Sequence, residues 1–183
     1  MGEPGTKEPL SLQDLEAVAG LRTGRKHVLS ILVENKSGVL TRIAGLFARR
    51  GFNIDTLTVG PTDDEHISRV TLTVDGAVHP IDQVTKQLHK LINVVKIRDL
   101  DASNAVSAEL LIVRVAGEGD KRTEALQIGE IFKAKIVDVD RRALTLRVVG
   151  TNDKLEALLE LLKPLGVLEV VRTGTIAMGR GRG

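Results

Sequence analysis

The segment from His27 to Gly60 constrains the fold more than any other part of the chain, because its apolar pattern changes period twice within a short distance. A strand comes first, in which Leu29, Ile31 and Val33 alternate with Val28, Ser30 and Leu32, and it is expected to be buried on both faces or nearly so. The chain then breaks at 35–38 (NKSG), a helical pattern follows, and Gly51 is placed to stop the helix as a left-handed cap. A second strand follows, so the segment reads as strand, glycine turn, helix, strand.

The turn before this helix has the features of a small-anion pocket. The expected apolar stripe of the helix is Val39, Leu40, Ile43, Ala44 and Phe47. Amides of a first helical turn have no partner within the helix, and together with the positive end of the dipole they can hold a carboxylate or phosphate. Gly38 allows a ligand to approach the backbone, and Asn35 and Asn53 can add polar contacts. The alternative is that Ser37 is only an N-cap and Gly38, Asn35 and Asn53 are ordinary turn or strand-entry residues.

The rest of the first half completes a βαββαβ order. Residues 67–74 alternate as a half-buried strand, Pro80 opens a second helix, and 94–100 return as a fourth strand. Two split βαβ units of this kind give a four-stranded antiparallel sheet with both helices on one face, which is the ferredoxin-like arrangement. In that arrangement the second strand is an edge of the sheet.

The second half repeats the same order after a polar linker at 102–105. The predicted elements are strands at 110–115, 135–139, 144–149 and 167–171 and helices at 123–132 and 155–162. The sequence therefore predicts an α+β chain of two ferredoxin-like domains in tandem, at 27–101 and 107–178. Residues 1–26 are expected to be a flexible extension and 179–183 a tail.

Composition excludes several classes of function. The chain has 183 residues, 42% of them hydrophobic and 27% charged, as in an ordinary globular protein, and no apolar run is long enough to span a membrane. It has no Cys, and its N-terminus carries acids that do not suit a signal peptide, so we expect a cytoplasmic protein. The four His are scattered, which predicts no metal site, and no catalytic constellation is present. Binding of RNA would suit the topology and the basic pI, but with only three Phe and no Trp or Tyr the chain lacks stacking platforms.

The run from Glu34 to Thr62, ENKSGVLTRIAGLFARRGFNIDTLTVGPT, resembles the ACT domain of the small, regulatory subunits of acetolactate synthase (acetohydroxyacid synthase). The resemblance continues to Met178, through a second ferredoxin-like domain that ends in GTIAMGRG. It implies that this chain is not an enzyme by itself and that it activates a separate catalytic large subunit. Thiamine diphosphate, FAD and Mg would then belong to that subunit, with no cofactor here. It also implies feedback inhibition by valine or another branched-chain amino acid.

The resemblance also implies a homodimer through the ACT domains, with the effector at their interface. The expected effector-binding residues are Asn35, Ser37, Gly38, Val39, Leu40, Asn53 and Ile54. The turn amides would hold the carboxylate of the amino acid, and the side-chain oxygens of Asn35 and Asn53 its ammonium. Because the second strand is an edge, Asn53 and Ile54 of one chain would approach the turn of the other. The alternative function is a free-standing amino-acid sensor that acts on another enzyme.

Overall fold

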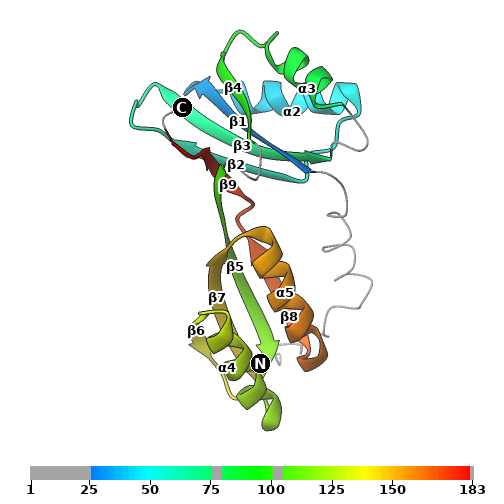
Figure 1. Ribbon diagram of the computed structural model, residues 1–183, viewed down its shortest axis with the longest axis vertical. Helices are drawn as coiled ribbons and strands as arrows, with labels where there is room; N and C mark the ends of the chain where they lie inside the picture. The colour runs from blue at the N-terminus through cyan, green and yellow to red at the C-terminus, as the bar shows by residue number, and fades with distance from the viewer. Residues whose placement is uncertain (1–25, 76–79, 101–104, 182–183) are drawn as a thin grey trace, which may run out of the picture. The chain divides into compact units, whose positions relative to one another are not determined.

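Figure 1 shows the computed structural model of the chain, which describes residues 26–75, 80–100 and 105–181. Almost all of the predicted extension 1–26, and linker residues 102–104, lie outside these ranges. The chain divides into two compact units. The second unit is Ala108–Thr173, and the described part of the first is everything else, including Gly174 to Gly181 at the end of the chain.

The first unit is a four-stranded antiparallel sheet with two helices on one face (Figure 1). Its elements are β1 (Lys26–Glu34), α2 (Val39–Arg50), β2 (Thr56–Pro61), β3 (Ile67–Asp75), α3 (Ile81–Leu88) and β4 (Val94–Leu100). The strand order is β2-β3-β1-β4. This confirms the predicted ferredoxin-like arrangement and the position of β2 at an edge.

The core of the first unit lies between this sheet and its helices. Its buried residues are Leu29, Ile31, Val33, Val39, Ile43, Leu46, Phe47, Val70, Leu72, Val74, Val84 and Leu88. Two members of the predicted stripe of α2, Leu40 and Ala44, are exposed, and Leu46 is buried instead. The prediction was wrong there because the buried face follows the spacing of Val39, Ile43, Leu46 and Phe47. Gly51 caps the helix with φ 68°, as expected.

The opposite face of this sheet is polar but not open. Thr71 and Thr73 on β3 are buried, so the expectation of a half-buried strand at 67–74 was wrong. Their cross-strand partners on β2 are Thr58 and Thr56. The chain returns to the first unit beside these partners at Gly174, whose φ is +80° and where an added Cβ would lie 3.0 Å from Thr58 Oγ1. Strand β9 (Ile176–Gly179), which was not predicted, then lies against β1 and β4 and pairs with β5 (Ala105–Ala116).

The second unit repeats the fold, as predicted. After β5 it contains α4 (Asp120–Ile131), β6 (Lys135–Val139), β7 (Ala143–Gly150), α5 (Asn152–Leu162), a short 3₁₀ turn (Lys163–Leu165) and β8 (Val167–Arg172). The strand order is β6-β7-β5-β8, and the buried core includes Leu111, Val113, Leu146, Leu155 and Leu158. No helix in the described ranges is both long and apolar enough to cross a membrane.

Candidate functional site

The turn between β1 and α2 presents backbone amides that have no protein partner. Gly38 occupies the N-cap position with φ 83°, a left-handed conformation, and no side chain caps the helix. The alternative that Ser37 is the N-cap is therefore wrong. Within the described ranges no group accepts a hydrogen bond from the amides of Gly38 or Leu40, and the Val39 amide reaches Lys36 O only at 3.4 Å. The start of the helix can therefore donate to an anion.

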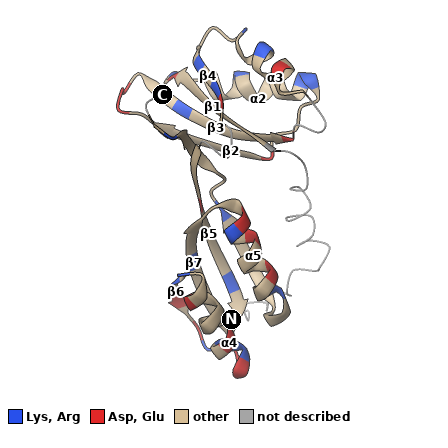
Figure 2. Ribbon diagram, viewed as in Figure 1, with Lys and Arg blue, Asp and Glu red and all other residues tan. Residues whose placement is uncertain are grey.

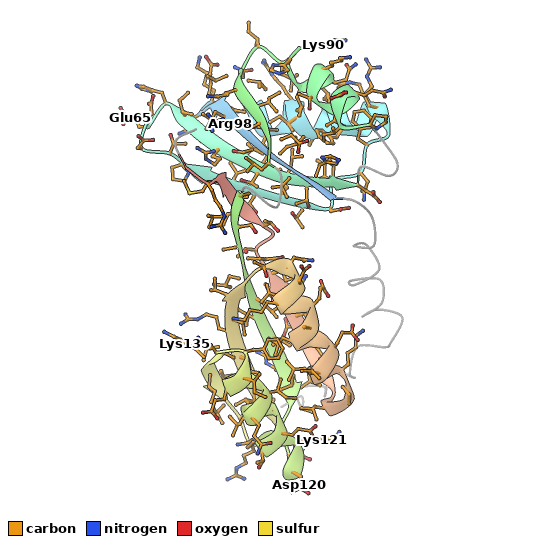
Figure 3. All side chains as sticks on the ribbon, in the orientation of Figure 1. Glu65, Lys90, Arg98, Asp120, Lys121 and Lys135 are labelled. Atoms are coloured by element: carbon orange, nitrogen blue, oxygen red, sulfur yellow. The ribbon has the colours of Figure 1, made fainter. Side chains whose placement is uncertain are left out.

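Asn35 is fixed against the hairpin between β2 and β3. Its backbone amide donates to His66 O at 2.7 Å, and its side-chain Nδ2 donates to Glu65 O at 3.0 Å. Figure 3 shows Glu65 at the tip of that hairpin. No described group donates a hydrogen bond to the carboxamide oxygen, so this oxygen can accept one from a ligand.

A polar network that the sequence analysis missed joins the end of β1, the first turn of α2 and the loop before β4. Asn93, in the loop before β4, donates through Nδ2 to Glu34 Oε2 at 2.5 Å and accepts from Arg42 Nη1 at 2.9 Å. Lys36 Nζ lies 3.2 Å from the same Glu34 oxygen. Hydrogen bonds to its carboxylate lower the pKa of Glu34 below the usual value. The bond from Asn93 has the larger effect and the bond from Lys36 the smaller one. The sequence held one indication of this network. Arg42 is a cation in the first turn of the helix, where its charge opposes the helix dipole, so it needs a hydrogen-bonding partner.

Asn53 and Ile54 lie at the other end of the sheet from the turn. The end of β1, Glu34, is opposite Ile67, whereas the start of β2, Thr56, is opposite Thr73. The 12 residues of α2 separate the two places, a length of about 18 Å at 1.5 Å per residue. Asn53 is exposed, with Nδ2 3.4 Å from Asp55 Oδ1, and Ile54 packs on the edge of the core. The structure thus groups Asn35 to Leu40 and places Asn53 and Ile54 elsewhere in the chain.

The described residues form no candidate metal centre. No group of three His, Cys, Asp or Glu among them could hold a metal ion. His27 Nδ1 lies 3.0 Å from Asp99 Oδ2 and His66 Nε2 lies 3.7 Å from Glu65 Oε1, both as single pairs. His79 lies outside the described residues.

Comparison with known proteins adds a consistent result over most of the chain. Residues 29–96 match the family described as the AHAS small subunit-like ACT domain, and residues 108–181 match the family described as the small subunit of acetolactate synthase. The acetolactate synthase small subunit of Mycobacterium leprae is 45% identical over 155 residues, which cover 85% of this chain and 92% of that protein. A probable counterpart from Archaeoglobus fulgidus is 46% identical over 156 residues, 85% of this chain and 98% of its own.

A solved structure agrees with both units. The crystal structure of the acetolactate synthase small subunit from Thermotoga maritima matches with a TM-score of 0.78 and 40% sequence identity. The match covers 87% of this chain and 99% of that one. At this identity and coverage the likeness extends beyond fold to family.

Proposed function

This chain belongs to the family of acetolactate synthase small subunits, and on that premise we propose that it activates a separate catalytic large subunit and makes it sensitive to feedback inhibition by valine. Catalysis, and with it thiamine diphosphate, FAD and Mg²⁺, belongs in this proposal to the large subunit. The observation that carries the regulatory part is the turn at Gly38, where unpartnered amides, a fixed carboxamide and an exposed apolar side chain lie within a few residues.

These groups match the three parts of a free amino acid. The amides of Gly38, Val39 and Leu40 would hold the carboxylate, helped by the positive end of α2 and by the exposed hydroxyl of Ser37. The free oxygen of Asn35 would accept from the ammonium. Leu40, which is 43% exposed although it is a large apolar residue in the first turn, would form the wall for a branched side chain.

A homodimer would complete the site with Asn53 and Ile54. If two β2 edges pair antiparallel about a two-fold axis, the start of one β2 lies beside the end of the other. The end of β2, Pro61, is opposite Ser68, which is itself opposite Val33, close to the turn. Pairing of the edges would therefore bring Asn53 of one chain toward the turn of its partner.

This arrangement suggests how the effector acts. A ligand held by groups of both chains stabilises the dimer geometry in which those groups are close, and it shifts the population toward that geometry. The catalytic subunit senses the change if it binds the two geometries with different affinity, which is the requirement for coupling between the sites.

Calorimetric titration of valine into the full chain, with catalytic-subunit activity assayed in parallel, tests the proposal. We expect saturable binding that falls about tenfold or more in Asn35→Ala, because a hydrogen bond to a charged group is lost, while activation is retained. Gln127→Ala, which removes an exposed carboxamide on α4, is the matched control and should bind normally. A holoenzyme that is insensitive to valine, or acetolactate formation by this chain alone, would overturn the proposal.

A further inference from the structure

The polar face of the first sheet contains a pocket lined mainly by cations. Its volume is about 160 Å³, and its lining residues are Ser30, Leu32, Arg69, Lys96 and Arg98. All five belong to the first unit, on β1, β3 and β4. None of them belongs to the turn proposed for valine.

Strand register explains why three cations meet here. On β1, Leu32 is opposite Arg69 of β3 on one side and Lys96 of β4 on the other, and Ser30 is opposite Arg98 of β4. Residues paired in this way point to the same face of a sheet, so the three cations surround one short stretch of β1. Figure 2 shows basic residues on β3 and β4, and Figure 3 labels Arg98 on this sheet.

The pocket is partly organised in advance. Arg69 Nη1 donates to Ser30 Oγ at 2.6 Å, and Ser30 itself is only 3% exposed. This bond to a buried hydroxyl fixes the guanidinium of Arg69 and reduces the entropy that a ligand must overcome to order it. The floor of the pocket is therefore a fixed polar surface rather than a set of free side chains.

The cations of the pocket form no ion pair in the described part of the chain. No described carboxylate forms an ion pair with Arg69, Lys96 or Arg98. Glu34, two residues beyond Leu32 on the same strand, is held by Asn93 at 2.5 Å and Lys36 at 3.2 Å. Three like charges in so small a space repel one another, and a multiply charged anion would relieve that repulsion.

We propose that this pocket binds a phosphate-bearing small molecule, with Arg69, Lys96 and Arg98 as its anion ligands. Two guanidinium groups can each take a phosphate bidentately, and a lysine adds a point charge. A diphosphate matches three cations better than a single carboxylate does, and the volume suits a group of that size. The pocket uses no residue of the valine turn, so this ligand and valine bind without competing.

Titration of inorganic pyrophosphate and of orthophosphate into the full chain, at low ionic strength, tests this assignment. We expect saturable binding, tighter for pyrophosphate, that weakens at least about tenfold in Arg98→Gln because one charged partner is removed. Lys90→Gln, just after α3, and Lys135→Gln, in the second unit, remove exposed cations that do not line the pocket (both labelled in Figure 3) and should change the affinity by less than about twofold. Equal thermal midpoints of Arg98→Gln and the unmodified chain exclude misfolding as the cause.

Three results would overturn the proposal. The first is an absence of saturable pyrophosphate binding, and the second is an equal loss in Lys90→Gln, which would mean diffuse attraction to net charge. The third is the first result combined with a loss of association between the catalytic subunit and the Lys96→Gln and Arg98→Gln variants, which would make this face a protein interface. The valine proposal is tested separately, because its failure leaves the pyrophosphate titration unchanged.

Discussion

Substitution of Gly38 by Ala separates a role in ligand binding from a role in the fold. Gly38 has φ +83°, and a Cβ added there would have no heavy atom within 4 Å. The cost to the folded chain is therefore only the left-handed backbone, about 1–2 kcal/mol, partly offset by the less flexible unfolded chain. We expect a net loss of about 1 kcal/mol in the free energy of unfolding, which lowers the thermal midpoint of a domain this size by about 4–8 °C.

The effect on valine should be larger. Ala at this position favours a negative φ, and this change would rotate the backbone amides of the turn away from the bound carboxylate. The new methyl group would also project into the open space where the ligand approaches. Loss of one charged hydrogen bond corresponds to about 1.5–3 kcal/mol, or about a tenfold to hundredfold weaker affinity by calorimetry.

Gly119→Ala provides the matched control. Gly119 is also an N-cap, of α4 in the second unit, with φ 56° and no heavy atom within 4 Å of an added Cβ. The Gly119→Ala substitution should lower the free energy of unfolding by at least as much as Gly38→Ala, and it should leave valine affinity unchanged. A role of the Gly38 turn in valine binding is refuted if Gly38→Ala keeps its valine affinity within about twofold of the unmodified chain, or if Gly119→Ala weakens valine binding equally.

Two further predictions concern stability. Phe47 is 1% exposed and packs edge to face on Phe52 with ring centroids 5.8 Å apart, so Phe47→Ala should cost about 3–5 kcal/mol in urea unfolding, and a loss below about 1 kcal/mol would contradict this account of the core. Asn93 and Lys36 lower the folded-state pKa of Glu34 below the ordinary value of 4.5. The Glu34 carboxylate therefore stabilises the fold at pH values above 4.5, and this stabilisation is lost as the pH falls through the lowered pKa. Thermal midpoints of Glu34→Gln and the unmodified chain should therefore differ most near neutral pH and converge in acid, and a constant difference would argue against the network.

The elements that could be predicted from sequence are those specified by local pattern. Helix α2 is bounded by Gly38 and Gly51, whose positive φ values are what a glycine at each end predicts, and the alternation around Leu29 and Val70 set the strands. The position of β2 at an edge followed from the order of elements. The turn was found for the same reason, since its break, glycine and helix start are contiguous.

The features that were missed depend on contacts between distant parts of the chain. Asn93 meets Glu34 across 59 positions, and nothing local to either residue indicates the other. Strand β9 is only four residues long, too short to show a period, and it lies against β1 and β4. Thr71 and Thr73 are buried although the alternation of β3 had predicted a half-buried strand. The stripe of α2 was misplaced at Leu40 because an exposed apolar residue and a buried one have the same appearance in sequence.

The return of the chain to the first unit at Gly174 makes that unit a host and the second unit an insertion within it. The host can form completely only when the ends of the insertion, Ala108 and Thr173, are held in place. If the insertion is unfolded, the host must close a loop of that length, which costs on the order of 4 kcal/mol of chain entropy. A fragment that stops before Gly174 also loses β9, the strand that lies against β1 and β4. The first unit should therefore be studied in the whole chain, because its stability is thermodynamically linked to that of the unit inserted within it.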